Sequence, residues 1–138
     1  MAERSLNEHL SHLLAQANRH LSRQLTAEGV SLDQWRLMKV LSESGGLPMG
    51  KLAEELALNL PTLTKLVDRM VQDALVYRVP DPADRRKVRM FLSDKGAAML
   101  ASQNKRVEEH EAKVEDSYGN EDAQRLKTML ESFIKQIV

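Results

Sequence analysis

The 138 residues of this chain, 42% of them hydrophobic, suffice for one domain with a core or for a smaller domain with an oligomerisation arm. Twenty Lys and Arg balance twenty Asp and Glu, so the overall charge gives no argument for a polyanionic partner, and the absence of Cys excludes disulfides, thiol switches and thiolate metal sites. Because the sequence has neither a signal-like start nor a run of about 20 apolar residues, we expect a cytoplasmic protein without a membrane span.

A long amphipathic helix is the first predicted element, over residues 5–28 with a stop near Gly29. Its apolar residues recur at steps of three and four: Leu6, Leu10, Leu13, Leu14, Ala17, Leu21 and Leu25. A second helix is predicted after Ser31, which forms a capping box with Gln34, and the Gly45-Gly46 pair ends it. The inward stripe of this helix consists of Leu32, Trp35, Met38 and Leu41.

Two further helices are predicted over residues 49–57 and from Asn59 to about Ala74, with Asn59 as N-cap and Pro61 in the first turn. Wound at about 100° per residue, the longer helix divides into two faces. The apolar face contains Leu63, Leu66, Val67, Met70 and Ala74, and the polar face contains Pro61, Thr62, Lys65, Asp68, Arg69 and Gln72. A short helix, a tight turn and an amphipathic helix are typical of a helix-turn-helix, whose second helix can enter a groove of DNA.

A basic hairpin is predicted next, with strands over residues 75–79 and up to Ser93. In the second strand, Val88, Met90 and Leu92 alternate with Lys87, Arg89 and Phe91, which is the period-two pattern of a half-buried strand. Four of the five residues 85–89 are basic, and residues 77–106 hold eight Lys or Arg against three Asp. Protection of a sheet edge is one use of such charge, but four cations without intervening acids exceed that need. A basic hairpin directly after a helix pair is typical of the wing with which winged-helix proteins present cations to DNA phosphates.

Two helices complete the predicted fold. Ser93 is a natural N-cap for a helix to about Ser117, whose apolar residues are too sparse to fill a monomeric core. After a break at residues 118–120, the last helix has a dense apolar stripe of Leu126, Met129, Leu130, Phe133, Ile134 and Ile137. This stripe needs a partner, which the first helix can supply from the same or another subunit. The fold is therefore predicted to be mainly α with a small β wing.

These patterns together resemble the MarR family of dimeric winged helix-turn-helix regulators. The resemblance rests on residues 52–56 with 62–70 for the helix-turn-helix, 75–78 for the following strand, and 81–86 with 92–96 for the wing. It implies one domain over residues 1–138, in which 32–93 form the DNA-binding lobe and 5–28 and 94–138 form the N- and C-terminal dimerisation helices. It also implies a homodimer that binds double-stranded DNA at an inverted repeat, typically as a ligand-responsive repressor of transcription.

The resemblance implies which residues contact DNA. The family's recognition positions correspond here to Thr62, Thr64, Lys65 and Arg69. The Asp-x-Arg of its wing corresponds to Asp84 and Arg86, so Arg86 is expected in the minor groove while Asp84 orients its guanidinium. The remaining basic residues of the wing, Arg85, Lys87 and Arg89, are expected to contact phosphates, which supply affinity rather than sequence choice.

Two positions depart from the family pattern. Ala74 stands where a glycine is usual, so the left-handed conformation expected there either costs about 1 kcal/mol or is replaced by another turn. Leu60 and Pro61 stand where small polar residues are common, which leaves fewer side chains to read base edges.

A small-molecule site is a further implication of the resemblance. In the family the effector cleft lies between the dimer helices and the DNA-binding lobe and often admits aromatic acids. The residues that could line it here are His9, Gln16, Arg19, His20, Arg23, Trp35 and Arg36. They could supply an anion partner and a stacking surface for an anionic aromatic or acyl-CoA-type ligand. It is equally consistent with the sequence that Trp35 belongs to the core, the arginines pair with Glu and the histidines are merely exposed.

Other functions have weaker support in the residues. His9 with His12, or His110 with Glu111, could share a metal in a metal-responsive regulator, but without a tight cluster of ligands solvated histidines are favoured. The sequence shows no nucleophile beside a base and no glycine-rich phosphate loop, so we expect neither an enzyme nor a bound cofactor. A winged helix that binds another protein is the alternative to DNA binding.

Overall fold

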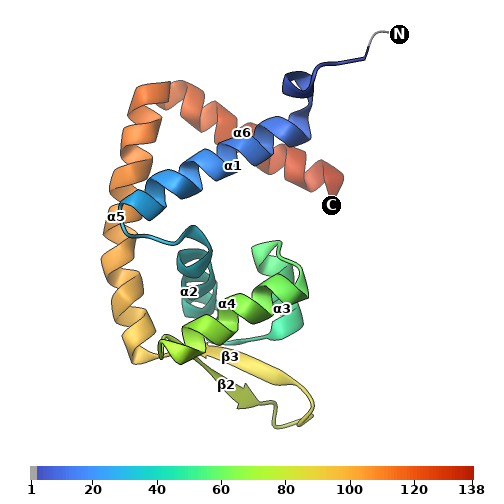
Figure 1. Cartoon of the computed structure of the whole chain (residues 1–138), viewed down its shortest axis with the longest axis vertical. Helices are drawn as coiled ribbons and strands as arrows, with labels where there is room; N and C mark the ends of the chain where they lie inside the picture. The colour runs from blue at the N-terminus through green and yellow to red at the C-terminus, as the bar shows by residue number, and fades with distance from the viewer. Residues whose placement is uncertain (1–2) are drawn as a thin grey trace. The chain divides into compact units, whose positions relative to one another are not determined.

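The computed structural model describes residues 3–138 and contains helices joined to a small sheet (Figure 1). In chain order the elements are the 3-10 turn η1 (Leu6–Glu8), α1 (Leu10–Ala27), α2 (Leu32–Ser44), β1 (Leu47–Pro48), α3 (Met49–Leu56), α4 (Leu60–Gln72), β2 (Val76–Pro80), β3 (Val88–Leu92), α5 (Asp94–Tyr118) and α6 (Asn120–Ile137). The chain divides into two compact units, one up to Asn104 and one over residues 105–138. Mainly α structure with one small antiparallel sheet confirms the predicted fold class.

The core of the first unit lies where α2, α3 and α4 meet the sheet (Figure 1). The strands are antiparallel in the order β1-β3-β2, and Met90 at the centre of β3 pairs with Leu47 of β1 and Arg78 of β2. The buried cluster consists of Leu37, Met38, Leu41, Leu52, Leu56, Leu63, Val67, Met70, Leu75, Val76, Met90 and Leu100. Because Leu100 belongs to this cluster, the first turns of α5 pack with the helix-turn-helix.

A tight turn between α3 and α4 sets the direction of α4. Ala57 ends α3 in the left-handed conformation, with φ of 53°, and Leu58 N donates to Ala53 O at 3.1 Å. Asn59 then caps α4 as predicted, because its Oδ1 accepts a hydrogen bond from Thr62 N at 2.9 Å. The two predicted helices therefore form the helix-turn-helix within one turn of each expected end.

The end of α4 is bonded to the start of α5. Ala74 has φ of 59°, so of the two predicted alternatives the left-handed conformation is the one adopted. Ser93 Oγ donates to Ala74 O at 2.7 Å and accepts from Gly96 N at 3.0 Å, which confirms Ser93 as an N-cap. Lys95 Nζ donates to Asp73 O at 2.7 Å. Carbonyl groups that the end of α4 leaves unpaired are thus satisfied by side chains that begin α5.

Two features of the first unit differ from the sequence-based expectation. The long first helix is interrupted at His9, where φ is −88° and ψ is 126°. The interruption has a local cause, since Ser5 and Glu8 form a reciprocal capping box that closes η1 as a separate turn. Strand β1 lies outside the predicted elements, because two residues are too few for a periodic pattern and only pairing with β3 defines them.

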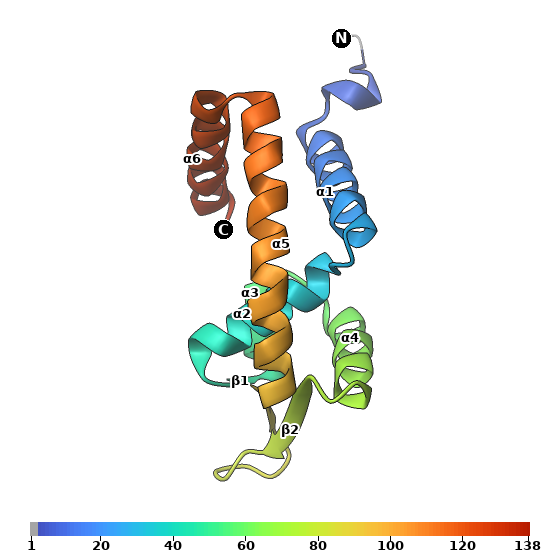
Figure 2. The ribbon, with the colours of Figure 1, turned by 90° about the vertical axis from the view of Figure 1, so that its left-hand side faces the viewer.

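The second unit consists of the last turns of α5 and the whole of α6, which follow one another as two helices joined by a tight turn (Figure 2). Gly119, with φ of 109°, makes the turn at the predicted break. Lys127 of α6 donates a hydrogen bond to the Glu115 carboxylate of α5, and this bond raises the pKa of Lys127 above its ordinary value. The hairpin is thus joined by an ion pair as well as by its turn.

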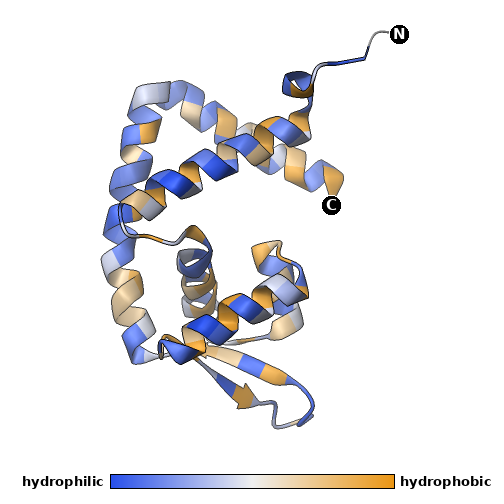
Figure 3. Cartoon of the chain, viewed as in Figure 1, coloured by the Kyte–Doolittle hydropathy of each residue, from blue (hydrophilic) through white to orange (hydrophobic). Residues whose placement is uncertain are grey.

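Apolar side chains remain exposed along α1 and α6, where they alternate with hydrophilic ones (Figure 3). On α6 they are Leu126, Met129, Ile134 and Ile137, and on η1 and α1 they are Leu6, Leu10, Leu13, Leu14 and Leu21. Met129 is 62% exposed and Ile134 is 54% exposed in the single chain. Exposed apolar residues gathered on helices in this way are typical of surfaces that another polypeptide covers.

Candidate nucleic-acid interface

The outer face of α4 carries the side chains predicted to read DNA. Thr62, Thr64, Lys65 and Arg69 are all exposed, whereas the opposite face buries its apolar side chains Leu63, Val67 and Met70 in the core. The Thr64 hydroxyl donates to Leu60 O at 2.9 Å, so its proton is used within the helix and its oxygen remains an acceptor. One exposed helix face therefore combines two cations with small polar groups.

A shallow, open hollow lies on this face of α4. It is lined by Lys65, Asp68, Arg69, Gln72 and Asp73. Within it, the Asp68 carboxylate accepts a hydrogen bond from Arg78 Nη2, which reaches it from β2. The sequence pattern places Asp68 on the polar face of the helix, but a pairing between a helix and a strand has no local signal that could have predicted Arg78 as its partner.

Aspartates form hydrogen bonds with the backbone of the wing tip, the loop of residues 81–87 between β2 and β3. This loop projects away from the helices of its unit (Figures 1 and 2). Asp81 Oδ1 accepts from Ala83 N at 2.9 Å, and Asp84 Oδ1 accepts from Arg86 N at 3.0 Å. Asp81 N donates to Lys87 O at 2.9 Å and closes the loop. Because side chains of this kind stabilise tight turns, the two acidic residues fix the loop on which the cations stand.

The cations of the tip are directed into solvent. The Arg86 side chain is 94% exposed, and its Nε lies 3.6 Å from Asp84 Oδ1. Arg85 and Lys87 are exposed on either side of it. The expected pairing of Asp84 with Arg86 is thus present in the chain without DNA, while most of the guanidinium remains open to a partner.

Arg89 has different surroundings from the other basic residues of the wing. It lies on β3 between Pro48 of β1 and Val79 of β2, and it is half-buried. Its Nε is buried and has no hydrogen-bond partner among the residues that the structure describes. Phe91, on the same strand, stacks on Tyr77 with ring centroids 5.6 Å apart. The outer face of the strand is therefore less open than the simple alternation of basic and apolar residues predicts.

The candidate ligand residues of the first helix are only partly brought together. Gln16, Arg19, His20 and Arg23 are exposed and follow the i, i+3, i+4, i+7 spacing of one helix face. His9 is the N-cap of α1 and lies in the break before it, so it is not part of the helical face that carries these four residues.

Trp35 and Arg36 are engaged by other residues of the first unit. Trp35 Nε1 donates to Asn104 Oδ1 at 2.8 Å, and Lys39 Nζ lies 5.8 Å from the centre of its ring. Arg36 Nη2 donates to Leu56 O at 3.0 Å, and its Nη1 lies 4.0 Å from Asp33 Oδ1. Arg36 therefore links α2 to the end of α3 by a hydrogen bond, and Trp35 links α2 to α5 in the same way.

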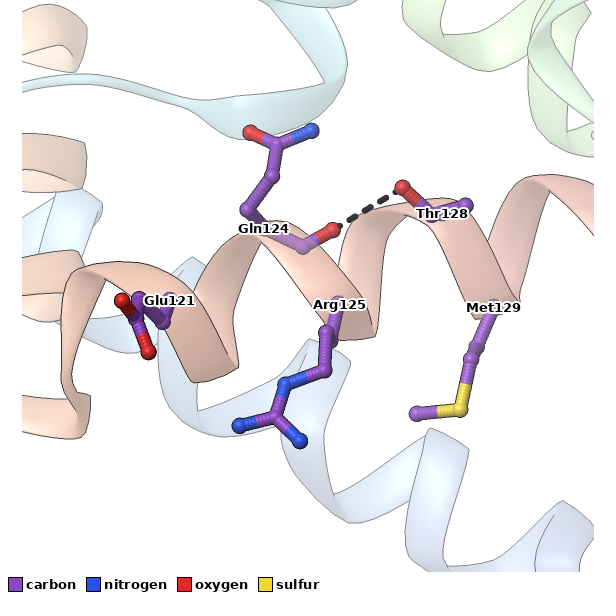
Figure 4. Close-up of a pocket in the computed structure, with 5 residues that line it drawn as sticks. All are labelled: Glu121, Gln124, Arg125, Thr128 and Met129. Carbon is purple, nitrogen blue, oxygen red and sulfur yellow. Dashed lines mark hydrogen bonds between the residues drawn. The ribbon is translucent and has the colours of Figure 1, made fainter.

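Another hollow lies on α6 and contains none of the candidate ligand residues (Figure 4). It is lined by Glu121, Gln124, Arg125, Thr128 and Met129, with Thr128 Oγ1 donating to Gln124 O at 3.0 Å. Within residues 3–138, no three His, Asp or Glu side chains gather in a way that could hold a metal ion. No helix in the same range is long and apolar enough to cross a membrane.

Known proteins with this arrangement bind DNA. A sequence model of the MarR family matches residues 30–88, from the start of α2 to the start of β3. The homoprotocatechuate degradative operon repressor of Escherichia coli is 33% identical over 101 residues, which cover 73% of this chain and 68% of that protein. The transcriptional repressor CouR, bound to a 23-mer DNA duplex, aligns with a TM-score of 0.83 and 25% identity over 96% of this chain and 99% of its own. NadR in complex with 4-hydroxyphenylacetate aligns with a TM-score of 0.73 and 26% identity over 96% of this chain and 97% of its own. The chain belongs to the MarR family of DNA-binding transcriptional regulators and is not an enzyme.

Proposed function

We propose that the chain represses transcription as a homodimer that binds an inverted-repeat site in double-stranded DNA. The observation that carries this proposal is that one unit exposes both the polar face of α4 and a wing tip whose Arg86 is 94% open to solvent. An exposed helix face can enter the major groove, and an exposed arginine suits the negative potential of a narrow minor groove. The structure of CouR on a duplex supports this use of the fold.

The proposed contacts fall into three groups. Thr62, Thr64, Lys65 and Arg69 face the major groove, and Arg86, oriented by Asp84, enters the minor groove. Arg85 and Lys87 contact phosphates, which strengthen binding to every sequence. For Arg89 the proposed phosphate contact is limited to the terminal nitrogens, since its Nε is buried.

The exposed apolar residues of α1 and α6 support the homodimer. We assign residues 32–93 to the DNA-binding lobe and residues 5–28 and 94–138 to dimerisation, with the first turns of α5 also packed on the lobe through Leu100. A two-fold symmetric dimer presents two copies of α4, the proposed recognition helix, and successive major grooves on one side of the duplex are about 34 Å apart. An inverted repeat with that spacing is the expected site.

Selection from a pool of random-sequence duplexes tests the DNA-binding function directly. The wild-type protein is expected to enrich a palindromic duplex, and its affinity should fall steeply with salt, with a log–log slope of roughly −0.9 for each phosphate contacted. A protein-interaction module would enrich no duplex and show little affinity for any. That second result would refute the proposed function.

A small anionic aromatic molecule is the effector class that we propose, with an acyl-CoA-type molecule as the alternative. NadR, a relative of known structure, is in complex with 4-hydroxyphenylacetate, an aromatic acid. In this chain the anion partners would come from His9, Gln16, Arg19, His20, Arg23 and Arg36, and the stacking surface from Trp35. Binding that changes the separation of the two lobes would weaken both half-sites together.

Titration of the protein with 4-hydroxyphenylacetate, and separately with a coenzyme A thioester, tests the effector class. The active compound is expected to raise the melting temperature and to lower the affinity for the selected duplex. Unchanged values of both quantities for both compounds would remove these two classes from consideration.

A further inference from the structure

We propose that Arg78 is a positioning residue for DNA binding, which neutralises Asp68 on the recognition face of α4 and ties the base of the wing to that helix. This inference rests on the proposed DNA-binding function and assigns a role to two residues outside the expected contacts. Its basis is the bond between Asp68 Oδ1 and Arg78 Nη2.

Asp68 lies among the groups proposed to face DNA. It shares the hollow on α4 with Lys65 and Arg69, and 59% of its side chain is exposed. A duplex brings a dense row of phosphates to this face, and an uncompensated carboxylate there would be repelled at close range. Some neighbouring cation must therefore offset Asp68 if α4 is to approach the groove.

Arg78 is placed to supply that charge. It lies on β2 opposite Met90 of β3, whose burial in the core fixes the position of the strand. Its side chain is 39% exposed, less than that of Asp68, so the guanidinium is supported by the protein while the carboxylate is nearer to solvent. Because Asp68 is paired with Arg78, its charge is offset without the use of Lys65 or Arg69.

The pair also adds a side-chain link between α4 and β2, which follow one another in the chain. Three other ion pairs of the described chain, Arg36–Asp33, Lys39–Glu43 and Arg125–Asp122, each lie within a single helix. The Asp68–Arg78 pair instead links the middle of α4 to the strand that leads into the wing. The recognition helix and the wing must reach different grooves at the same time, but hydrogen bonds of the turn at Ala74 already join α4 to β2, so we expect the neutralised charge rather than this link to decide the affinity.

A double-mutant cycle on the duplex selected by the wild-type protein tests this role. Arg78→Gln leaves the Asp68 charge facing DNA and is expected to weaken binding by about tenfold or more. Asp68→Asn should change the affinity by less than about threefold, and the double variant should return to within about threefold of wild type. Arg78→Lys restores the charge and should recover most of the affinity. Lys39→Gln, which breaks an exposed pair on α2, is the matched control and should leave the affinity unchanged.

Each contrary result has a distinct meaning. If the double variant binds as weakly as Arg78→Gln, Arg78 contacts DNA itself and the positioning role is wrong. If Asp68→Asn alone loses affinity or selects a different base, Asp68 reads the sequence, as carboxylates can do at cytosine N4, and the proposal is again wrong. If Arg78→Gln leaves the affinity for the duplex unchanged, the Asp68–Arg78 pair is an ordinary surface ion pair without a role in DNA binding, and the proposal is wrong.

Folding and function are separated by two further observations. Melting temperatures of all variants should lie close to wild type, because exposed ion pairs contribute little to stability. Should Arg78→Gln fail to fold, the uncharged double variant still decides, since near-wild-type affinity supports the proposal and a large loss overturns it. If the wild-type protein enriches no duplex, the DNA-binding function itself is refuted. If the wild-type protein binds DNA and the losses of affinity in the two single variants add up in the double variant, only the role of Arg78 is refuted.

Discussion

Arg86 combines a fixed backbone with an open side chain. Its amide is bonded to Asp84 Oδ1 at 3.0 Å, and the same oxygen lies 3.6 Å from Arg86 Nε. One carboxylate therefore positions both ends of the residue, while the terminal nitrogens are left for DNA. This arrangement lowers the entropy that the side chain loses on binding, which is the usual benefit of preorganisation.

Arg86→Ala should abolish tight binding to the selected duplex, because it removes the only groove-inserting residue that we propose for the wing. Lys87→Ala is the matched control, since it removes one charge from the same loop. It should weaken all duplexes to a similar extent and reduce the salt slope by about one phosphate contact. Fluorescence anisotropy at several salt concentrations distinguishes these outcomes, and unchanged affinity for Arg86→Ala would exclude the wing assignment.

At the scale of elements, two alanines occupy the turns at either end of the recognition helix. Ala57 and Ala74 have φ of 53° and 59°, a conformation that glycine adopts without steric cost. Because bonds from Ser93 and Lys95 surround the second turn, the fold can hold Ala74 in this conformation. The strain is therefore offset by contacts with the start of α5.

Ala74→Gly should stabilise the protein by about 0.5–1 kcal/mol, since it relieves the left-handed strain. Ala101→Gly, at an exposed position inside α5, should instead destabilise it by about 0.5–1 kcal/mol. Urea denaturation measures both free energies of unfolding. A loss of the same size in the two variants would contradict the left-handed conformation of Ala74.

Gly96→Ala should destabilise the joint between α4 and α5 by about 1–3 kcal/mol. A methyl group there would collide with the Leu75 carbonyl and with the Leu92 side chain. Gly50→Ala in α3 is the matched control, because no atom lies within 4 Å of the added carbon, and it should gain about 0.5–1 kcal/mol. Thermal or urea unfolding should therefore give changes in stability of opposite sign for the two variants. A gain in stability for Gly96→Ala would show that the start of α5 is not tightly packed against Leu75 and Leu92.

Whether a feature could be predicted from the sequence depends on how far apart along the chain the interacting residues lie. The Asn59 cap, the Ser93 cap and the break at Gly119 depend on neighbours in the chain, and each was predictable. The Asp68–Arg78 pair and the Trp35–Asn104 bond join residues distant in sequence, and no periodic pattern encodes them. The burial of Arg89 Nε also escaped prediction, because alternation along one strand does not show what the neighbouring strands cover.

At the scale of the whole molecule, the two units have different requirements. The first unit has a buried core that extends from α2 to the start of α5. The second is a helical hairpin whose apolar residues are largely exposed in the single chain. A hairpin of this size buries too little surface to be stable by itself, which favours a further surface to pack against. A second copy of the chain satisfies this need in the proposed homodimer.

Ile134→Asp should therefore separate the dimer, because it places a charge on the most apolar face of α6, where Ile134 is now 54% exposed. A monomer can hold only one half-site, so affinity for the selected palindrome should fall by about 100-fold or more. Thr128→Asp adds the same charge to the same helix outside the apolar stripe and should leave both the dimer and the affinity unchanged. Sedimentation velocity gives the mass of each variant, and circular dichroism checks that the helices are intact. A variant Ile134→Asp that remains dimeric and binds the palindrome normally would remove α6 from the interface, and dimerisation would then have to rest on the leucines of η1 and α1.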